Sequence, residues 1–183
     1  MRTKEIEENK RTDINNEKEK RILNIGCGDD MYGTDRIDFY KTKATTKICN
    51  VEEGLPFEDN TFDKLKADYV LEHLKNIGFF INECHRVLKY GGILDLQTDN
   101  AGYIIFHIKT EHNRMMERKE YIKHPDDHHY HLFVPSHLKY LLKDFSKVKI
   151  SYPKLERKLW KNILLSLLPF HWGDEGLRAI AIK

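Results

Sequence analysis

The apolar residues of this chain fall into short runs that are separated by polar and glycine-containing stretches. Short apolar runs that contain β-branched residues and end at turn-forming residues are typical of buried strands. One such strand is expected to end at Asp38, in the segment DRIDF. The remaining predicted strands cover residues 21–25, 46–49, 62–67, 93–97, 148–151 and 177–182.

One longer segment repeats its apolar residues at helical spacing. These residues are Ile77, Phe80, Ile81, Cys84, Val87 and Leu88. Asn76 is a suitable N-cap for this helix. Lys89, followed by Gly91 and Gly92, predicts its C-terminal end. We also expect residues 69–76 to begin a helix, and Ser136 to cap a short helix up to residue 145.

Strands that alternate with helices predict an α/β fold with a mainly parallel sheet. In such sheets, ligands bind beyond the carboxyl ends of the strands. Several polar or glycine residues follow predicted strands and should therefore meet at one edge. They are Gly26, Gly28, Asp38, Asn50, Asp68 and Asp99.

Length and composition are consistent with one domain at residues 21–183, preceded by a charged arm at residues 1–20. The chain has 183 residues, a net charge of only +2 and three cysteines without C-x-x-C spacing. These values argue against a disulfide framework, a zinc knuckle or a required polyanionic partner. The N-terminal residues do not resemble a signal peptide, and no apolar run is long enough to span a membrane. We therefore expect a cytoplasmic protein.

The glycine turn after the first strand does not follow the dinucleotide-binding pattern. That pattern has a third glycine where this chain has Met31, and it places its ribose-binding acid about 20 residues after the turn. Here Asp38 follows Gly28 by ten residues, which leaves no room for a full helix. Both departures argue against NAD and FAD.

The joint pattern of RILNIGCG, DRIDF, LPFEDNTFD, YVLEHL and RVLKYGG resembles the class I S-adenosylmethionine (SAM)-dependent methyltransferases of the small type 11 kind. The short first connection is similar to that of a compact subgroup, often associated with surface-polysaccharide biosynthesis. The resemblance implies a Rossmann-like sheet in the order 3-2-1-4-5-7-6 with an antiparallel last strand. It also implies a SAM-dependent methyltransferase with SAM as its cofactor.

SAM offers a carboxylate and a ribose diol that match two groups near the first strand. The backbone N–H groups of Gly26, Cys27 and Gly28 suit the carboxylate of its methionine moiety. The carboxylate of Asp38 suits the ribose hydroxyls, because it accepts from two donors at once. Asp35 would take that place if the second strand were shifted.

Three further residues complete the expected cofactor site. Asn50 stands where the family usually has an acid facing the adenine amino group, and its amide oxygen can accept the same hydrogen bond. Val51 would pack on the adenine. Asp68 would lie near the SAM ammonium group, or would act as a helix N-cap.

Methyl transfer needs alignment of the acceptor with the sulfonium, and a general base only where the accepting atom carries a weakly acidic proton. The candidate catalytic residues are Tyr69, His73, His129 and His131, with Asp99 as a further candidate base. Seven of the ten histidines lie between residues 107 and 137. This cluster forms part of a substrate-facing lid, a solvated loop, or a metal site helped by Asp126 and Asp127. We assign no metal ligand from the sequence.

Residues 101–145 and 152–173 are expected to be lids or substrate-side insertions. Within the second, residues 154–168 are basic and aliphatic, which is compatible with a lid, a dimer contact or contact with a membrane surface. The expected acceptor is a small molecule or a saccharide and not nucleic acid, since no basic stripe with interleaved aromatic residues occurs outside residues 154–161. The alternatives are a non-catalytic SAM-binding protein and a metal-dependent hydrolase that uses the histidines. The oligomeric state is left open.

Overall fold

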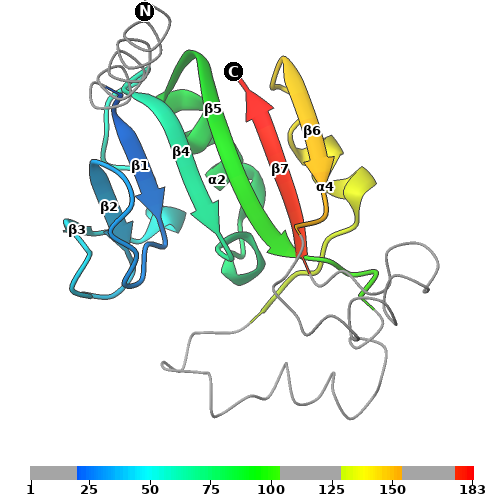
Figure 1. Cartoon of the computed structure of the whole chain (residues 1–183), viewed down its shortest axis with the longest axis horizontal. Helices are drawn as coiled ribbons and strands as arrows, with labels where there is room; N and C mark the ends of the chain where they lie inside the picture. Colours follow the sequence, from blue (N-terminus) through cyan, green and yellow to red (C-terminus); the bar gives the residue numbers. More distant parts are fainter. Residues whose placement is uncertain (1–19, 104–128, 154–175) are drawn as a thin grey trace, which may run out of the picture.

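The computed structural model describes residues 20–103, 129–153 and 176–183. They form one seven-stranded sheet in the order β3-β2-β1-β4-β5-β7-β6 (Figure 1). The strands are β1 (Ile22–Ile25), β2 (Asp35–Asp38), β3 (Lys47–Ile48), β4 (Phe62–Asp68), β5 (Leu88–Asp99), β6 (Lys147–Ser151) and β7 (Gly176–Ile182). The helices are α2 (Ile77–Val87), α4 (Pro135–Leu141) and the 3₁₀ turns η1 (Val51–Glu53) and η2 (Leu71–His73).

Strand order and direction confirm the α/β, Rossmann-like fold class. The pairs β2–β3, β1–β2, β1–β4 and β4–β5 are parallel, whereas β7 is antiparallel to both β5 and β6. In Figure 1 the arrowheads of β1, β4 and β5 all end at the lower edge of the sheet, and β7 runs the other way. We call this lower edge the carboxyl edge. It is where the connections that follow the parallel strands meet.

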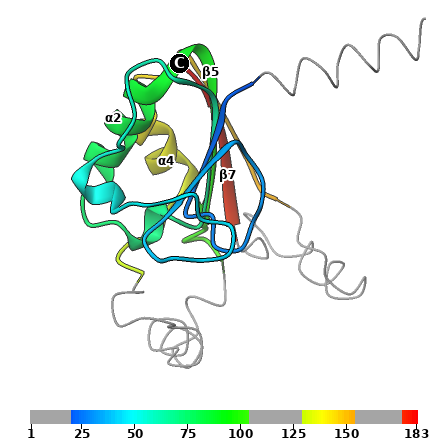
Figure 2. The ribbon, with the colours of Figure 1, turned by 90° about the vertical axis from the view of Figure 1, so that its left-hand side faces the viewer.

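The hydrophobic core lies between one face of the sheet and the helices α2 and α4, which lie on the same side in Figure 2. Alternating residues of the central strands point to this face, for example Leu65 and Leu94. Phe80 and Cys84 of α2 are fully buried in this core, and so is Leu138 of α4. The side chain of Asn76 caps α2 by accepting from the backbone N–H of Phe79, as expected.

The opposite face of the sheet is polar. Among the described residues, no helix covers it, and the short connection between β1 and β2 replaces the helix that usually follows the first strand. The alternate positions of β4, β5 and β7 carry Lys64, Lys66, Asp95 and Arg178 on this face, where they form ion pairs. Tyr32, from the β1–β2 connection, lies with its ring 5.4 Å from the ammonium of Lys64. We call this surface the polar face.

Three local predictions were wrong. Residues 69–76 do not begin an α-helix but form η2, because Tyr69 adopts a φ of 54° that no continuous helix accommodates. The helix α2 ends at Val87 without help from the glycines, and Leu88 already pairs with Phe62 as the start of β5.

The N-cap of α4 is Val134, with no side-chain cap, and not Ser136. Pro135 explains this shift, since its fixed φ is suited to the first helical position.

Several expectations lie outside the described residues: most of the arm at 1–20, the histidines from His107 to His128, and the amphipathic segment at 154–168. The boundaries of the expected lids at 101–145 and 152–173 therefore stay predictions. In the described part of the chain, no helix combines the length and apolar character needed to cross a membrane.

Candidate functional site

The turn after β1 and the end of β2 meet at the carboxyl edge. The backbone N–H of Gly28 donates to Oδ2 of Asp38 at 2.8 Å. The N–H of Tyr40 donates to Oδ1 of the same carboxylate at 2.9 Å. Each oxygen of Asp38 keeps a further lone pair, so this carboxylate still suits a pair of hydroxyl donors.

Glycine is required in the turn for two different reasons. Gly26 has a φ of +65°, and a Cβ there would lie 2.5 Å from Cγ2 of Val70 in the connection after β4. Gly28 has a φ of +50°, and a Cβ there would meet no atom within 4 Å. The backbone beside Gly28 therefore borders open space, where a ligand can approach the chain closely.

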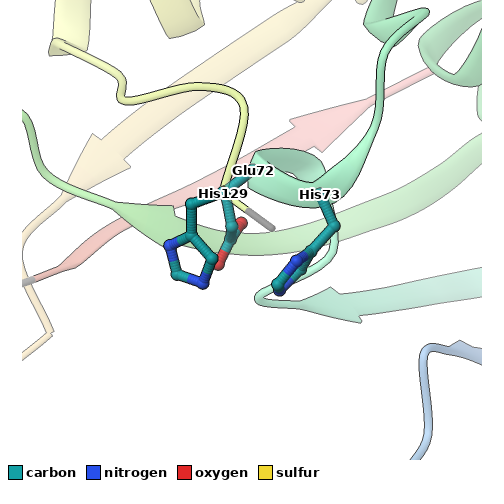
Figure 3. A group of neighbouring side chains, drawn as sticks. All are labelled: Glu72, His73 and His129. Atoms are coloured by element: carbon teal, nitrogen blue, oxygen red, sulfur yellow. The ribbon is translucent and has the colours of Figure 1, made fainter. Parts of the chain in front are cut away.

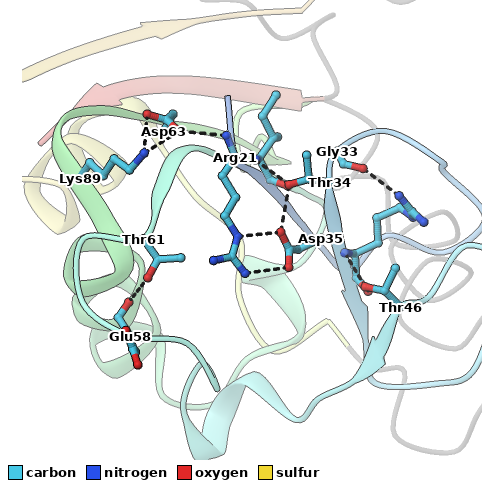
Figure 4. Close-up of polar contacts among 11 residues, drawn as sticks. Arg21, Gly33, Thr34, Asp35, Thr46, Glu58, Thr61, Asp63 and Lys89 are labelled. Carbon is cyan, nitrogen blue, oxygen red and sulfur yellow. Dashed lines mark hydrogen bonds and ion pairs between the residues drawn. The ribbon is translucent and has the colours of Figure 1, made fainter. Parts of the chain in front are cut away.

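Asp35 is not an alternative to Asp38, because it lies at the amino end of β2. There both of its carboxylate oxygens accept from the guanidinium of Arg21, at 3.1 Å each (Figure 4). This pair lowers the pKa of Asp35 below its ordinary value, with the hydrogen bond from Arg21 as the largest cause. The second strand is therefore not shifted, and Asp35 does not take the place of Asp38 as the candidate ribose-binding acid.

The other expected cofactor residues make local contacts. The thiol of Cys27 is buried near Thr45, so this residue offers a ligand only its backbone. Asn50 caps η1: its amide oxygen accepts from the N–H of Glu52 at 3.1 Å, and its amide nitrogen donates to Glu53. Val51 packs against the hydrophobic core.

Asp68 and Tyr69, at the end of β4, also engage neighbouring side chains. Asp68 pairs with Lys66 at 3.0 Å and is not a helix N-cap, since the N-cap position of η2 belongs to Val70. The hydroxyl of Tyr69 accepts from the side chain of Gln97 at 2.6 Å.

Glu72, in η2, is a site residue that sequence reasoning did not single out. It is fully buried, and its Oε2 accepts from the hydroxyl of Thr98 at the end of β5, at 2.8 Å. Its Oε1 is buried with no hydrogen-bond partner among the described residues. The only signal in the sequence is an acid surrounded by apolar neighbours in the segment VLEHL, a pattern that an exposed turn shares.

The backbone of Glu72 also holds the segment that carries the candidate histidines. Its carbonyl accepts from the N–H groups of Tyr130 at 2.7 Å and His131 at 3.3 Å. Farther along, the N–H of Ala101 donates to the carbonyl of Phe133 at 2.7 Å. These contacts lay residues 129–133 along the carboxyl edge, beside η2.

His73 and His129 lie together beside Glu72 (Figure 3). Their rings meet edge to face, with centroids 4.5 Å apart. Nδ1 of His129 makes an ion-pair contact of 2.8 Å with Oδ2 of Asp99, which is 4% exposed. The ring of His131 lies instead near Phe133, with centroids 6.2 Å apart, so the structure brings together two of the four candidate catalytic residues.

Burial raises the pKa of Glu72 to about 7, with the charge of Asp99 as the next cause. The carboxylate thus changes its protonation state near neutral pH. Two acids and two imidazoles in one cluster can take up a proton, orient a hydroxyl or bind a cation. We call Glu72, His73, Asp99 and His129 the edge cluster.

Comparison with known proteins finds a family match in the middle of the chain. Residues 23–96 match the family described as "Methyltransferase domain". The "Ubiquinone biosynthesis O-methyltransferase, mitochondrial" of Rattus norvegicus is 41% identical over 54 residues. These residues are 30% of this chain and 16% of that protein. The chain therefore spans only a small part of this relative.

Solved structures share the fold at low sequence identity. A SAM-dependent methyltransferase from Archaeoglobus fulgidus aligns with a TM-score of 0.60 and 16% identity, covering 90% of this chain and 86% of that one. Phosphoethanolamine N-methyltransferase 2 from Haemonchus contortus, solved with phosphomonomethylethanolamine and S-adenosylhomocysteine, aligns with a TM-score of 0.58 and 16% identity. That alignment covers 90% of this chain and 49% of the other.

Proposed function

We propose that this chain is a class I SAM-dependent methyltransferase that transfers the methyl group to a small-molecule or saccharide acceptor. The family match of residues 23–96 and the shared fold support this proposal. The acceptor would be held at the carboxyl edge, beside the edge cluster. The observation that carries the proposal is the contact between the turn at residues 26–28 and Asp38, 2.8 Å from the N–H of Gly28.

The residues of the turn after β1 and of the end of β2 fit the cofactor. Asp38 is fixed by two backbone donors and keeps lone pairs for the ribose hydroxyls. The open space beside Gly28 suits the methionine moiety, whose carboxylate favours backbone N–H groups. When bound, SAM supplies an electrophilic methyl group on a sulfonium, so the protein has only to align an acceptor and, for a weakly acidic one, to remove its proton.

His129 is the residue that we propose for proton removal in the metal-free protein. The carboxylate of Asp99 lies 2.8 Å from Nδ1 of His129, and a negative charge at that distance stabilises the imidazolium that forms. Imidazole and carboxylate groups also hydrogen-bond hydroxyls, which supports a polyol or another small polar acceptor. The net charge of +2 offers little support for nucleic acid.

Calorimetry with SAM and S-adenosylhomocysteine tests the cofactor site. We expect Asp38→Ala to weaken binding by roughly 2–4 kcal/mol, because two charge-assisted hydrogen bonds are lost. Asp35→Ala is the matched control, since it removes the same group from the opposite end of the same strand. Equal affinity of the wild type and Asp38→Ala would remove Asp38 from the site.

A methyl-transfer assay with labelled SAM and a panel of acceptors tests the acceptor side. With a chelator present, we expect His129→Ala to lower turnover by about a hundredfold, the usual contribution of a general base, with little change in SAM affinity. His137→Ala, on the exposed surface of α4, is the control. A protein that binds SAM but methylates no member of a broad panel would favour the non-catalytic alternative.

A further inference from the structure

Glu72, His73 and His129 present three metal-ligating atoms in a compact group. One oxygen or nitrogen of each lies within 4.8 Å of the other two. Two of the residues come from η2, and the third comes from a segment more than fifty positions away. Figure 3 shows the carboxylate of Glu72 directed to the space between the two imidazole rings.

The buried carboxylate of Glu72 makes this group more than a chance meeting of polar side chains. Its Oε2 is fixed by the hydroxyl of Thr98, whereas its Oε1 has no partner among the described residues. A buried carboxylate oxygen without a partner is costly, because it has lost its hydration without a replacement. A cation bound between Glu72 and the two histidines would supply that replacement.

His129 lies beside a buried carboxylate, as metal-binding histidines often do. A ligating imidazole normally uses its other nitrogen to contact a carboxylate or carbonyl, which orients the ring and raises its basicity. In this chain Nδ1 of His129 lies 2.8 Å from Oδ2 of Asp99. We take Nε2 of His129 as the ligand atom, because Nδ1 faces the carboxylate of Asp99.

We propose that Glu72, His73 and His129 bind one divalent transition-metal ion, with Zn²⁺ as the best match. Two histidines and one glutamate are a ligand set of catalytic zinc sites, in which a fourth position remains for water or substrate. The imidazole nitrogens favour Zn²⁺ or a similar ion over Mg²⁺, which prefers oxygen ligands. Metal–ligand bonds of about 2.1 Å require the three side chains to draw closer by rotation.

The backbone keeps the two halves of the site in register. The N–H of Tyr130 donates to the carbonyl of Glu72 at 2.7 Å, so the residues that flank His129 and His73 are tied together without an ion. When the ion is bound, His129 is one of its ligands and does not act as the base. The pKa of the acceptor group would then depend on the ion. Metal binding itself does not depend on the proposed methyl transfer, because it is measured without SAM.

The test is calorimetric titration of ZnCl₂ into the full chain after treatment with a chelator and its removal. We expect one ion per chain, and a d–d absorption band of a low-coordinate site when Co²⁺ replaces Zn²⁺. Glu72→Gln, His73→Ala and His129→Ala should each weaken binding by about a hundredfold or more. Asp99→Asn should weaken it by about ten- to a hundredfold, as expected for an outer partner of a ligand.

His137→Ala is the control, because it removes an exposed histidine of the same part of the chain. Circular dichroism checks that each variant is folded, and Glu72→Gln keeps the size of the buried side chain. No binding of Zn²⁺ to the wild type at micromolar concentrations would overturn the proposal, as would an equal loss in His137→Ala and His129→Ala. Failure of this test leaves SAM binding at Asp38 unaffected, so the two proposals are judged separately.

Discussion

Glu72 at the carboxyl edge and Asp95 on the polar face are both buried acids, but their surroundings differ in charge. Asp95 is 4% exposed and accepts from Arg178 through both oxygens, at 2.8 and 2.7 Å. The ammonium of Lys64 lies 3.0 Å from the same carboxylate. Burial by itself would raise the pKa of Asp95, but the hydrogen bonds from Arg178 and Lys64 outweigh it and lower that pKa.

Glu72 has no comparable cation among the described residues. Its neighbours are the hydroxyl of Thr98, the imidazoles of the edge cluster and a second acid, Asp99, and its pKa rises to about 7. The comparison shows that burial alone does not decide the charge of an acid: the nearest partners do. A buried acid with cations stabilises the sheet, whereas one that faces imidazoles is available for chemistry or for a ligand.

The largest expected effect concerns the pH dependence of stability at Glu72. An unfolded glutamate ionises near 4.5, whereas the folded Glu72 ionises near 7. The stabilisation is therefore fully present below pH 4.5 and is lost as the pH rises through 7. Between about pH 4 and pH 8, we expect the wild type to lose about 3 kcal/mol relative to Glu72→Gln.

Urea denaturation in the presence of a chelator measures this difference in the metal-free protein. Parallel pH profiles of the unfolding free energy for the wild type and Glu72→Gln would mean that Glu72 has the same pKa in the folded and unfolded chain. The carboxylate would then be charged in the folded protein at neutral pH. The contrast with Asp95 would then disappear.

A smaller effect on stability, with the opposite dependence on pH, is expected at Asp95 on the polar face. Arg178→Met removes the two hydrogen bonds to Asp95 and keeps an apolar side chain of similar length. We expect a loss of about 1–3 kcal/mol near pH 7, moderated because the side chain of Arg178 is 47% exposed. Because the pKa of Asp95 is lowered in the folded state, its contribution is present above the unfolded pKa and is lost as the pH falls through the folded one.

The matched control for Arg178→Met is Lys43→Met, which removes an ion pair with Asp29 whose side chains are 73% and 66% exposed. Urea denaturation should detect almost no change in that variant, since exposed pairs contribute little. Equal losses in the two variants would show that the cations of the polar face do not stabilise Asp95 any more than a surface pair does.

The smallest expected effect concerns the hydrogen bond from Thr98 to Glu72. Thr98→Val removes the hydroxyl that donates to Oε2 at 2.8 Å and keeps the shape of the side chain. We expect a loss of about 1 kcal/mol at pH 8, where Glu72 is ionised, and a higher pKa for Glu72. Thr98→Ser retains the hydroxyl and should restore both values. An unchanged pH profile in Thr98→Val would show that this hydrogen bond does not hold the carboxylate.

The sequence by itself determined the framework of this protein. The apolar runs with glycines and acids after them predicted the strands around residues 22–25 and 62–68 and the edge at which their ends meet. The spacing of Phe80 and Cys84, with Asn76 before them, predicted α2 and its cap. These features could be predicted because period, cap and turn chemistry act between residues close together in the chain.

Only the tertiary structure decided which polar groups meet and which acids are charged. Asp38 reaches Gly28 and Asp35 reaches Arg21 because β2 lies parallel to β1, a fact that assigns the two acids to opposite ends of one strand. The cluster of Glu72 with His129 depends on hydrogen bonds between η2 and a segment far along the chain. Local periodicity carries no information about such contacts, and the pKa of a carboxylate follows from the groups around it and the water excluded from it.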